Sequence, residues 1–313
     1  MTRVAISIGD LNGIGIQLAI ENHYTISKII EPLYCIDKTM LAQAAEKLRL
    51  TIPNDFQTTE NIAPHFDIEA GAISKKSGAY AYASFVKAVE LAKENKVDAV
   101  MTLPIHKKAW ELAGVSYKGH TDALRDFFDT EAIMMLGCEK MYVALFTEHT
   151  PLKEVAGSIN EKDLTRFLLD FYHAAKPNQQ IGVLGLNPHA GDDGILGNEE
   201  TIIQKAIDNA NNTITNWCCE DKTPYSNPLV PDVAFTARVR ANYTHYIAMY
   251  HDQGLAPLKT LYFDEGINIS LNLPILRTSV DHGTAFDIAY TGKKLSHLSY
   301  INAITYIRSQ YEK

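Results

Sequence analysis

The sequence has few cysteines, and no two of them are spaced like the ligands of a zinc ribbon. Only Cys35, Cys138, Cys218 and Cys219 occur in 313 residues. None forms a C-x-x-C pair, and adjacent cysteines have poor geometry for bonding to each other. We therefore expect reduced thiols, as is usual in the cytoplasm, and neither a disulfide framework nor a structural zinc site.

A long apolar run and an excess of positive charge are also missing. No run approaches the ~18 residues of a membrane span, and the chain passes from Met-Thr-Arg directly into a strand-like segment at residues 4–8, which leaves no signal-peptide core. Lys and Arg number 29 against 37 Asp and Glu, for a formal net charge of −8. We expect a cytoplasmic protein that binds neither nucleic acid nor membrane.

Short apolar runs alternate with helical patterns along the chain. The runs lie at residues 4–8, 97–103, 142–146, 181–186 and 246–250. Helical periodicity is found at residues 80–94, 163–174 and 199–210, and residues 224–231 form a proline-rich stretch that we interpret as an ordered loop. This alternation indicates α/β layers around a mainly parallel sheet, whose functional loops lie at the carboxyl ends of the strands.

Three of the eleven histidines share a context that the others lack. His149, His189 and His251 each come shortly after an apolar run, in a turn with Pro or Gly nearby. If their strands are parallel neighbours, the three imidazoles converge at one sheet edge. Three neutral imidazoles suit Zn²⁺ or a similar ion and leave a position open for substrate. The alternative is three separate turn histidines that only orient loops.

Polar residues stand in apolar company near the C-terminus. Lys259, Asn268 and Arg277 are each flanked by Leu, Ile or Pro, and such groups need partners when they are buried. They either form a salt bridge with Asp252 or Asp281, or they bind a phosphate or carboxylate, a role that suits Arg and Lys.

Three glycine-containing turns are open to more than one interpretation. The turn at residues 9–15 lacks the G-x-G-x-x-G pattern, so its glycines serve either a tight turn or a ligand. After Gly119, Thr121 or Asp122 would cap a helix, unless the loop meets substrate. The His-Gly-Thr-Ala turn at residues 282–285 is expected to open a helix, which is unusual for this sequence. It is either a capped helix start with Thr284 as the cap or a functional loop.

Together these segments resemble the 4-hydroxythreonine-4-phosphate dehydrogenase family of the vitamin B6 pathway. The resemblance is carried by Gly9-Asp10 with Gly13-Ile14-Gly15, Gly119-His120-Thr121, Leu186-Asn187-Pro188-His189-Ala190-Gly191, Met249-Tyr250-His251-Asp252-Gln253-Gly254-Leu255 and Arg277-Thr278-Ser279-Val280-Asp281-His282-Gly283-Thr284-Ala285. Leu11-Asn12 departs from the family's usual Pro-Ala, and residues 21–64 match least well.

The resemblance implies a fold with two α/β/α domains, mainly parallel sheets and an interdomain active-site cleft. His282-Gly283-Thr284-Ala285-x-Asp287 is also similar to the cofactor loop of the isocitrate and isopropylmalate dehydrogenases. We expect residues 1–125 with 265–313 to form a discontinuous cofactor-loop domain, and residues 126–264 to form a metal-binding and dimerisation domain. The family forms homodimers in which the partner subunit completes the site.

The resemblance also implies a role for each candidate residue. The implied metal ligands are His149, His189 and His251. Zinc is the expected metal, and magnesium and cobalt are the alternatives. The implied substrate contacts are His120, Thr121, Lys259, Asn268 and Arg277. The implied cofactor contacts are His282, Gly283, Thr284, Ala285 and Asp287. The candidates for the general base are Asp232, His120 and Lys259.

The implied reaction is the NAD-dependent oxidation and decarboxylation of 4-phosphooxy-L-threonine to 3-amino-2-oxopropyl phosphate, in pyridoxal phosphate biosynthesis. One alternative is the same chemistry on 4-phosphothreonate or 4-phosphoerythronate, and another is an inactive binding protein. We expect NAD to be preferred over NADP, because the Asp287 carboxylate would accept a ribose hydroxyl and repel a phosphate. Alternatively, Asp287 only complements a helix dipole.

Overall fold

The computed structural model describes residues 1–218 and 223–312, which divide into two compact units. Unit 1 comprises Met1–Thr130, Ile267–Ile269 and Leu273–Lys313, and unit 2 comprises Glu131–Gly266 and Ser270–Asn272. The sequence prediction placed the corresponding boundaries after residues 125 and 264. Unit 1 is therefore assembled from distant parts of the chain, with unit 2 encoded between them.

Unit 1 is built on parallel strands. β1 (Arg3–Ser7) pairs with β2 (Glu31–Cys35) on one side and with β3 (Ala99–Thr102) on the other, and β3 also pairs with β9 (Leu276–Val280). Nearly all of these residues are buried, as expected for a parallel sheet covered on both faces. The helices of unit 1 are α1 (Gly15–Ile26), α2 (Lys38–Leu48), α3 (Lys75–Lys93), α4 (Lys107–Leu112), α5 (His120–Phe128) and α12 (Leu298–Tyr311).

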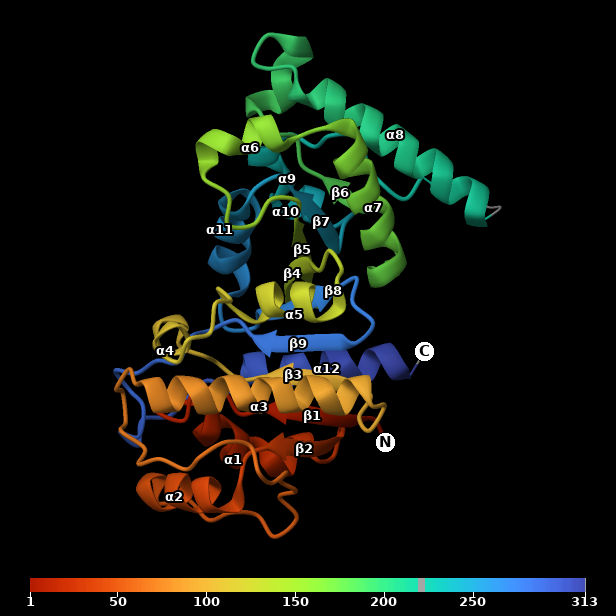
Figure 1. Ribbon diagram of the computed structural model, residues 1–313. Helices are drawn as coiled ribbons and strands as arrows, with labels where there is room; N and C mark the ends of the chain where they lie inside the picture. The colour runs from red at the N-terminus through yellow and green to blue at the C-terminus, as the bar shows by residue number, and fades with distance from the viewer. Residues whose placement is uncertain (219–222, 313) are drawn as a thin grey trace. The chain divides into compact units, whose positions relative to one another are not determined.

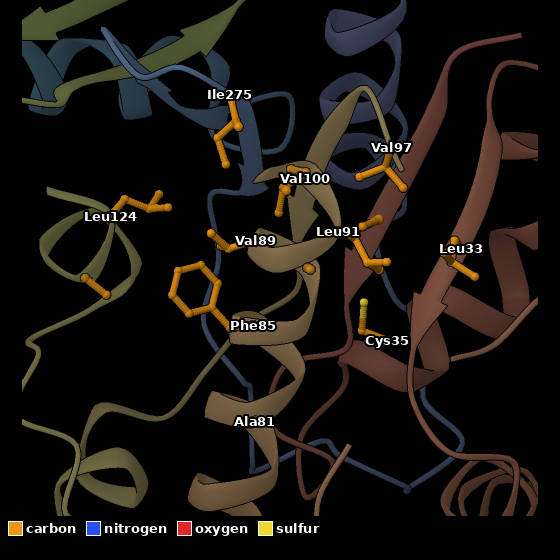
Figure 2. Close-up of a cluster of buried hydrophobic side chains, with 14 of the residues drawn as sticks. Leu33, Cys35, Ala81, Phe85, Val89, Leu91, Val97, Val100, Leu124 and Ile275 are labelled. Carbon is orange, nitrogen blue, oxygen red and sulfur yellow. The ribbon is translucent and has the colours of Figure 1, made fainter. Parts of the chain in front are cut away.

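The core of unit 1 centres on α3. This helix contacts β1, β2 and β3, while α12 contacts β9 and β3 (Figure 1). Phe85 is fully buried, and Figure 2 shows it with Val89 in a cluster that also includes Leu33, Val100 and Leu124. The apolar face of one long helix therefore holds the strands of this unit together.

Unit 2 has a mixed set of strands. β4 (Ile133–Cys138) forms an antiparallel hairpin with β5 (Met141–Leu145), and the parallel order continues from β5 to β7 (His245–Ala248) and β6 (Gly182–Val183). In β8 (Ile267–Leu271), Ile267–Ile269 belong to unit 1 and the residues from Ser270 belong to unit 2. The helices of unit 2 are α6 (Leu152–Ser158), α7 (Glu161–Ala175), 3₁₀ helix η1 (Pro188–Gly194), α8 (Glu199–Cys218), α9 (Pro231–Ala234), α10 (Ala237–Arg240) and α11 (His251–Tyr262).

The predicted α/β class with a mainly parallel sheet is confirmed, as are the three predicted helices. The proline-rich stretch is an ordered loop, because Tyr225 and Leu229 form parallel bridges with Ile181 and Leu184. Cys35 and Cys138 are buried free thiols, whereas the Cys218 side chain and Cys219 lie outside the described residues. In the described ranges, no helix combines the length and apolar character needed to cross a membrane.

Two helical glycines differ sharply in the space around them. A Cβ on Gly78 of α3 would lie 2.0 Å from the Ala109 carbonyl oxygen, whereas one on Gly157 of α6 would meet no described atom within 4 Å. We predict that Gly78→Ala lowers the unfolding free energy by about 1–3 kcal/mol through overpacking, while Gly157→Ala raises it by about 0.5 kcal/mol. Urea denaturation followed by circular dichroism measures both, and equal effects would contradict the close packing of α3 on α4.

Candidate functional site

Arg277 is a deeply buried cation on β9, with only 2% of its surface exposed. Its Nε and Nη2 groups donate to the Thr102 hydroxyl oxygen at 3.1 and 2.6 Å, and Nη1 lies 3.5 Å from the Asn268 amide oxygen. Thr102 and Asn268 satisfy N–H groups without neutralising charge, and burial lowers the pKa of Arg277 to about 9. An anionic ligand would offset the cost of burying this charge.

The alternative salt bridge from Arg277 to Asp252 is not supported. The Asp252 side chain is 85% exposed, and its Oδ1 lies 2.7 Å from Nδ1 of the adjacent His251. This removes Asp252 as a salt-bridge partner of Arg277, while a salt bridge to Asp281 and the binding of an anion both stay predictions.

His120 lies near Arg277 as a neutral ring. Its ring packs edge-on against Phe85 and Trp110, with centroids 4.8 and 5.3 Å away, and 9% of the residue is exposed. Burial, and after it the charge of Arg277, hold the pKa of His120 well below 6.5. Its Nε2 has no hydrogen-bond partner within the described chain. His120 therefore keeps one buried ring nitrogen without a partner in the described chain, and it is a weak base.

The helix that carries His120 begins differently from the prediction. α5 starts at His120 itself, with Gly119 in extended backbone as the N-cap, so neither Thr121 nor Asp122 is the cap. The Asp122 carboxylate instead accepts the backbone N–H of Lys118 at 2.9 Å. This start places both His120 and Thr121 in the first turn of the helix, where both are buried.

The glycine turn packs against the segment that was expected to bind the cofactor. The Ile14 N–H donates to the Thr284 carbonyl oxygen at 3.1 Å. A Cβ on Gly13 would lie 2.8 Å from that same oxygen, so only glycine allows this approach. Gly9 has φ of +70° and lies against the Pro104 carbonyl. The glycines thus bring three chain segments together.

Asn12, which belongs to the Leu11-Asn12 departure from the family pattern, ties a further segment to this turn. Its amide donates to the Ala72 carbonyl at 2.8 Å and accepts the Glu69 N–H at 3.0 Å. Its own carbonyl accepts the Gly71 N–H at 2.8 Å. Sequence reasoning missed residues 69–72 because they carry no periodic pattern or chemically distinctive side chain.

The His-Gly-Thr-Ala segment does not open a helix, so that prediction is wrong. Ala285 and Tyr290 adopt left-handed backbone, with φ of 45° and 60°, which interrupts helical geometry. Helix α12 begins only at Leu298. Thr284 is therefore not a helix cap, and the exposed Asp287 has no helix dipole to complement. Burial lowers the pKa of His282 in the same segment.

Asp10 is a fully buried carboxyl at the base of the glycine turn. It accepts hydrogen bonds from the Asn12 N–H at 3.0 Å and the Ser77 hydroxyl at 3.2 Å. Burial raises the pKa of Asp10 from 3.8 to about 6, although both hydrogen bonds act in the opposite direction. Two neutral donors therefore only partly replace the water that this carboxylate has lost.

In unit 2, the strands that precede the three histidines are parallel neighbours in the order β5, β7, β6 (Figure 1). The rings of His149 and His251 lie 5.8 Å apart. Asp252 engages Nδ1 of His251 at 2.7 Å, which leaves Nε2 for another partner. A carboxylate behind one imidazole nitrogen is the usual support for a metal-binding histidine, so this pair fits a divalent ion.

His189 is not brought into a group with the other two. The described residues contain no set of three or more His, Cys, Asp or Glu side chains placed to hold a metal ion. His189 starts a run of positive φ values inside η1 that continues to Gly194. Left-handed backbone costs about 1–2 kcal/mol for each non-glycine residue, so this turn is held under strain.

The remaining candidates also lie in unit 2. Asp232 is exposed in the first turn of α9, a helix that contacts η1. Lys259 lies in the last turn of α11, with its Nζ 6.0 Å from the centre of the Phe263 ring. The structure thus divides the predicted site residues between the units. Unit 1 carries His120, Thr121, Asn268, Arg277, His282, Gly283, Thr284, Ala285 and Asp287, and unit 2 carries His149, His189, Asp232, His251 and Lys259.

Comparison with known proteins gives consistent matches. A family model described as "Pyridoxal phosphate biosynthetic protein PdxA" matches residues 28–307. A 4-hydroxythreonine-4-phosphate dehydrogenase of Sulfurimonas denitrificans is 59% identical, covering 96% of this chain and 95% of the relative. One from Campylobacter fetus is 49% identical over 98% and 97%. The crystal structure of the Klebsiella pneumoniae 4-hydroxythreonine-4-phosphate dehydrogenase has a TM-score of 0.81 at 28% identity, covering 98% of this chain and 100% of that one.

The raised pKa of Asp10 makes stability depend on pH. The folded chain keeps a proton that the unfolded chain loses at its ordinary pKa of 3.8, so stability falls as pH rises toward about 6. We predict that Asp10→Asn removes this loss and becomes more stable than the wild type by about 2–3 kcal/mol at pH 7, but not at pH 4. Urea unfolding at both pH values tests this, with the exposed Asp67→Asn as control. A difference that does not vary with pH would contradict it.

Proposed function

We start from the fact that the chain belongs to the PdxA family of pyridoxal phosphate biosynthetic proteins, and we propose that it oxidises and decarboxylates 4-hydroxythreonine 4-phosphate with NAD. Its named relatives are dehydrogenases, so it is an oxidoreductase. The observation that most supports an anionic substrate is Arg277, which is 2% exposed and contacts the neutral Thr102 and Asn268.

The proposed reaction balances with NAD as the only oxidant. A base takes the proton of the C3 hydroxyl, and the hydride on C3 passes to NAD, which becomes NADH. The resulting β-keto acid loses its carboxylate as CO₂, and the electron pair of the broken carbon–carbon bond takes up a proton at C2. The products are 3-amino-2-oxopropyl phosphate, CO₂ and NADH.

The residues of unit 1 suit the binding of anions. We assign Arg277 to a phosphate or carboxylate of the substrate, because its guanidinium can donate a fork of hydrogen bonds. His120 and Thr121 would add neutral hydrogen bonds, with Asn268 beside them. The low pKa of His120 argues against a role as general base. This leaves Asp232 and Lys259 as the better candidates for the base.

The residues of unit 2 suit a divalent ion. We propose His149, His189 and His251 as its ligands, with zinc the best match to imidazole donors. The adjacent rings of His149 and His251 and the Asp252 contact support this assignment. When bound, such an ion lowers the pKa of a hydroxyl group and stabilises negative charge on oxygen.

The nicotinamide cofactor belongs to the same proposal. We assign residues 282–285 and Asp287 to NAD, and their packing against the glycine turn supports a rigid loop. A homodimer and a cytoplasmic location complete the proposal. The family resemblance implies the homodimer, whereas the expected reduced thiols and the lack of a long apolar run favour the cytoplasm.

The first test of function concerns Arg277. We predict turnover of 4-hydroxythreonine 4-phosphate with NAD, and an increase of about 30-fold or more in its KM in Arg277→Ala, equal to ~2 kcal/mol of charge-assisted hydrogen bonding. The KM for NAD should be unchanged. NADH absorbance is followed with this substrate, with 4-phosphothreonate and with 4-phosphoerythronate. It measures both the turnover and the preference among the three substrates.

The exposed Arg166, which pairs with Asp163, provides the matched control for this test. Arg166→Ala should behave as the wild type. A wild-type KM in Arg277→Ala would instead favour a purely structural role. If none of the three acids is turned over, an inactive binding protein becomes the better account.

The second test concerns the choice of cofactor. Asp287 is exposed and lies outside any helix, so a helix dipole no longer explains its charge. We predict that the wild type prefers NAD and that Asp287→Ala narrows the NAD-to-NADP ratio of kcat/KM by about tenfold, mainly through the KM for NAD. The exposed Asp264→Ala is the control, and a ratio unchanged in Asp287→Ala would remove Asp287 from the cofactor site.

A further inference from the structure

The backbone just before His189 is held by a carboxylate from α8. Oε1 of Glu200 accepts the N–H of Leu186 at 2.8 Å and the N–H of Asn187 at 2.7 Å, and Oε2 accepts the Asn187 side-chain amide at 2.9 Å. Glu199 contacts the same amide at 2.7 Å, but not the backbone of these two residues. Hydrogen bonds to a charged acceptor are stronger than neutral ones. Glu200 therefore fixes residues 186–187 more firmly than Glu199 does.

Secondary structure alone does not provide this anchoring. β6 consists of only Gly182 and Val183, so the strand ends well before His189. By contrast, His251 is itself the first residue of α11. The position of His189 thus depends on contacts made by the turn.

The turn that follows residues 186–187 is held by hydrogen bonds within itself. The N–H of Ala190 donates to the Asn187 carbonyl at 3.1 Å, and the N–H of Leu196 donates to the Gly191 carbonyl at 3.0 Å. A Cβ on Gly197 would lie 2.2 Å from the side-chain nitrogen of Asn187, so the chain closes tightly over this amide. Asn187 is therefore the fixed point from which the left-handed run at residues 189–193 extends.

We propose that Glu200 is a positioning residue for His189, and that it makes residues 186–187 the pivot on which this turn brings His189 to an ion held by His149 and His251. The inference rests on the metal site of the proposed function. His189 forms no group of three with that pair among the described residues, so ion binding would reorder the His189 side chain or the residues that follow Asn187. A fixed pivot reduces the conformational entropy lost in that reordering.

The test is a titration of the metal-free protein with Co²⁺, followed by visible absorption and calorimetry. Glu200→Ala should weaken Co²⁺ binding by about 10- to 100-fold, which is the usual effect of removing a supporting contact behind a metal ligand. Glu200→Gln should lose less, because its amide oxygen can still accept the N–H groups of Leu186 and Asn187. Glu199→Ala, the matched control, should change affinity by less than about threefold.

Hydrogen–deuterium exchange supplies a second readout. Co²⁺ should slow amide exchange in residues 186–197 of the wild type. The slowing should be smaller in Glu200→Ala when the two proteins are compared at equal Co²⁺ occupancy. Circular dichroism checks that each variant is folded. If Glu200→Ala does not fold, Glu200→Gln takes its place in the test.

The outcomes separate the two proposals. Wild-type affinity and an unchanged Co²⁺ spectrum in the Glu200 variants would overturn the pivot but leave the metal site intact. Equal losses in Glu199→Ala and Glu200→Ala would also overturn it, because the backbone contacts would then be irrelevant. If the wild type binds no more Co²⁺ than His251→Ala does, the metal site itself fails, and the pivot fails with it.

Discussion

The parallel pairing of strands is the constraint on which the sites of both units depend. A parallel strand must be followed by a crossover, so the carboxyl ends of neighbouring strands lie at one edge and their turns are placed together. In unit 2 this rule puts the turns after β5, β7 and β6 next to each other. In unit 1 it sets Arg277 of β9 beside Thr102 of β3. The candidate histidines of unit 2 therefore follow strand ends, whereas Arg277 and Asn268 of unit 1 lie within strands β9 and β8.

Buried charge is the second theme of unit 1. Arg277 and Asp10 are both inaccessible, and each is met by neutral hydroxyl or amide groups in the contacts described above. Burial moves the pKa of each toward neutrality, down for the arginine and up for the aspartate. Neutral partners leave the net charge of each group in place, so a charged ligand can still respond to it.

Periodicity and motifs predicted much of this architecture, and the misses have physical causes. Helices such as α3 and α7 follow from their apolar periodicity, and Arg277 from its charge in apolar company. The helix expected after residue 285 fails because a left-handed Ala285 leaves no signature in the sequence. The same holds for the turn of His189, whose geometry depends on hydrogen bonds to Glu200. The alternation of strands and helices could be inferred from sequence, but backbone handedness within a turn could not.

The discontinuity of unit 1 bears on how the chain folds as it is synthesised. Thr102 and Arg277 are 175 residues apart, and the whole of unit 2 is translated between them. Until β9 emerges from the ribosome, β3 has an unpaired edge, which is the kind of surface that invites wrong pairing or aggregation. Unit 2 can complete its core during that interval, because its strands and helices are already available. The buried surroundings of Arg277 are therefore among the last parts of the molecule to form, and a truncated or stalled chain would expose the edge of β3 without ever acquiring them.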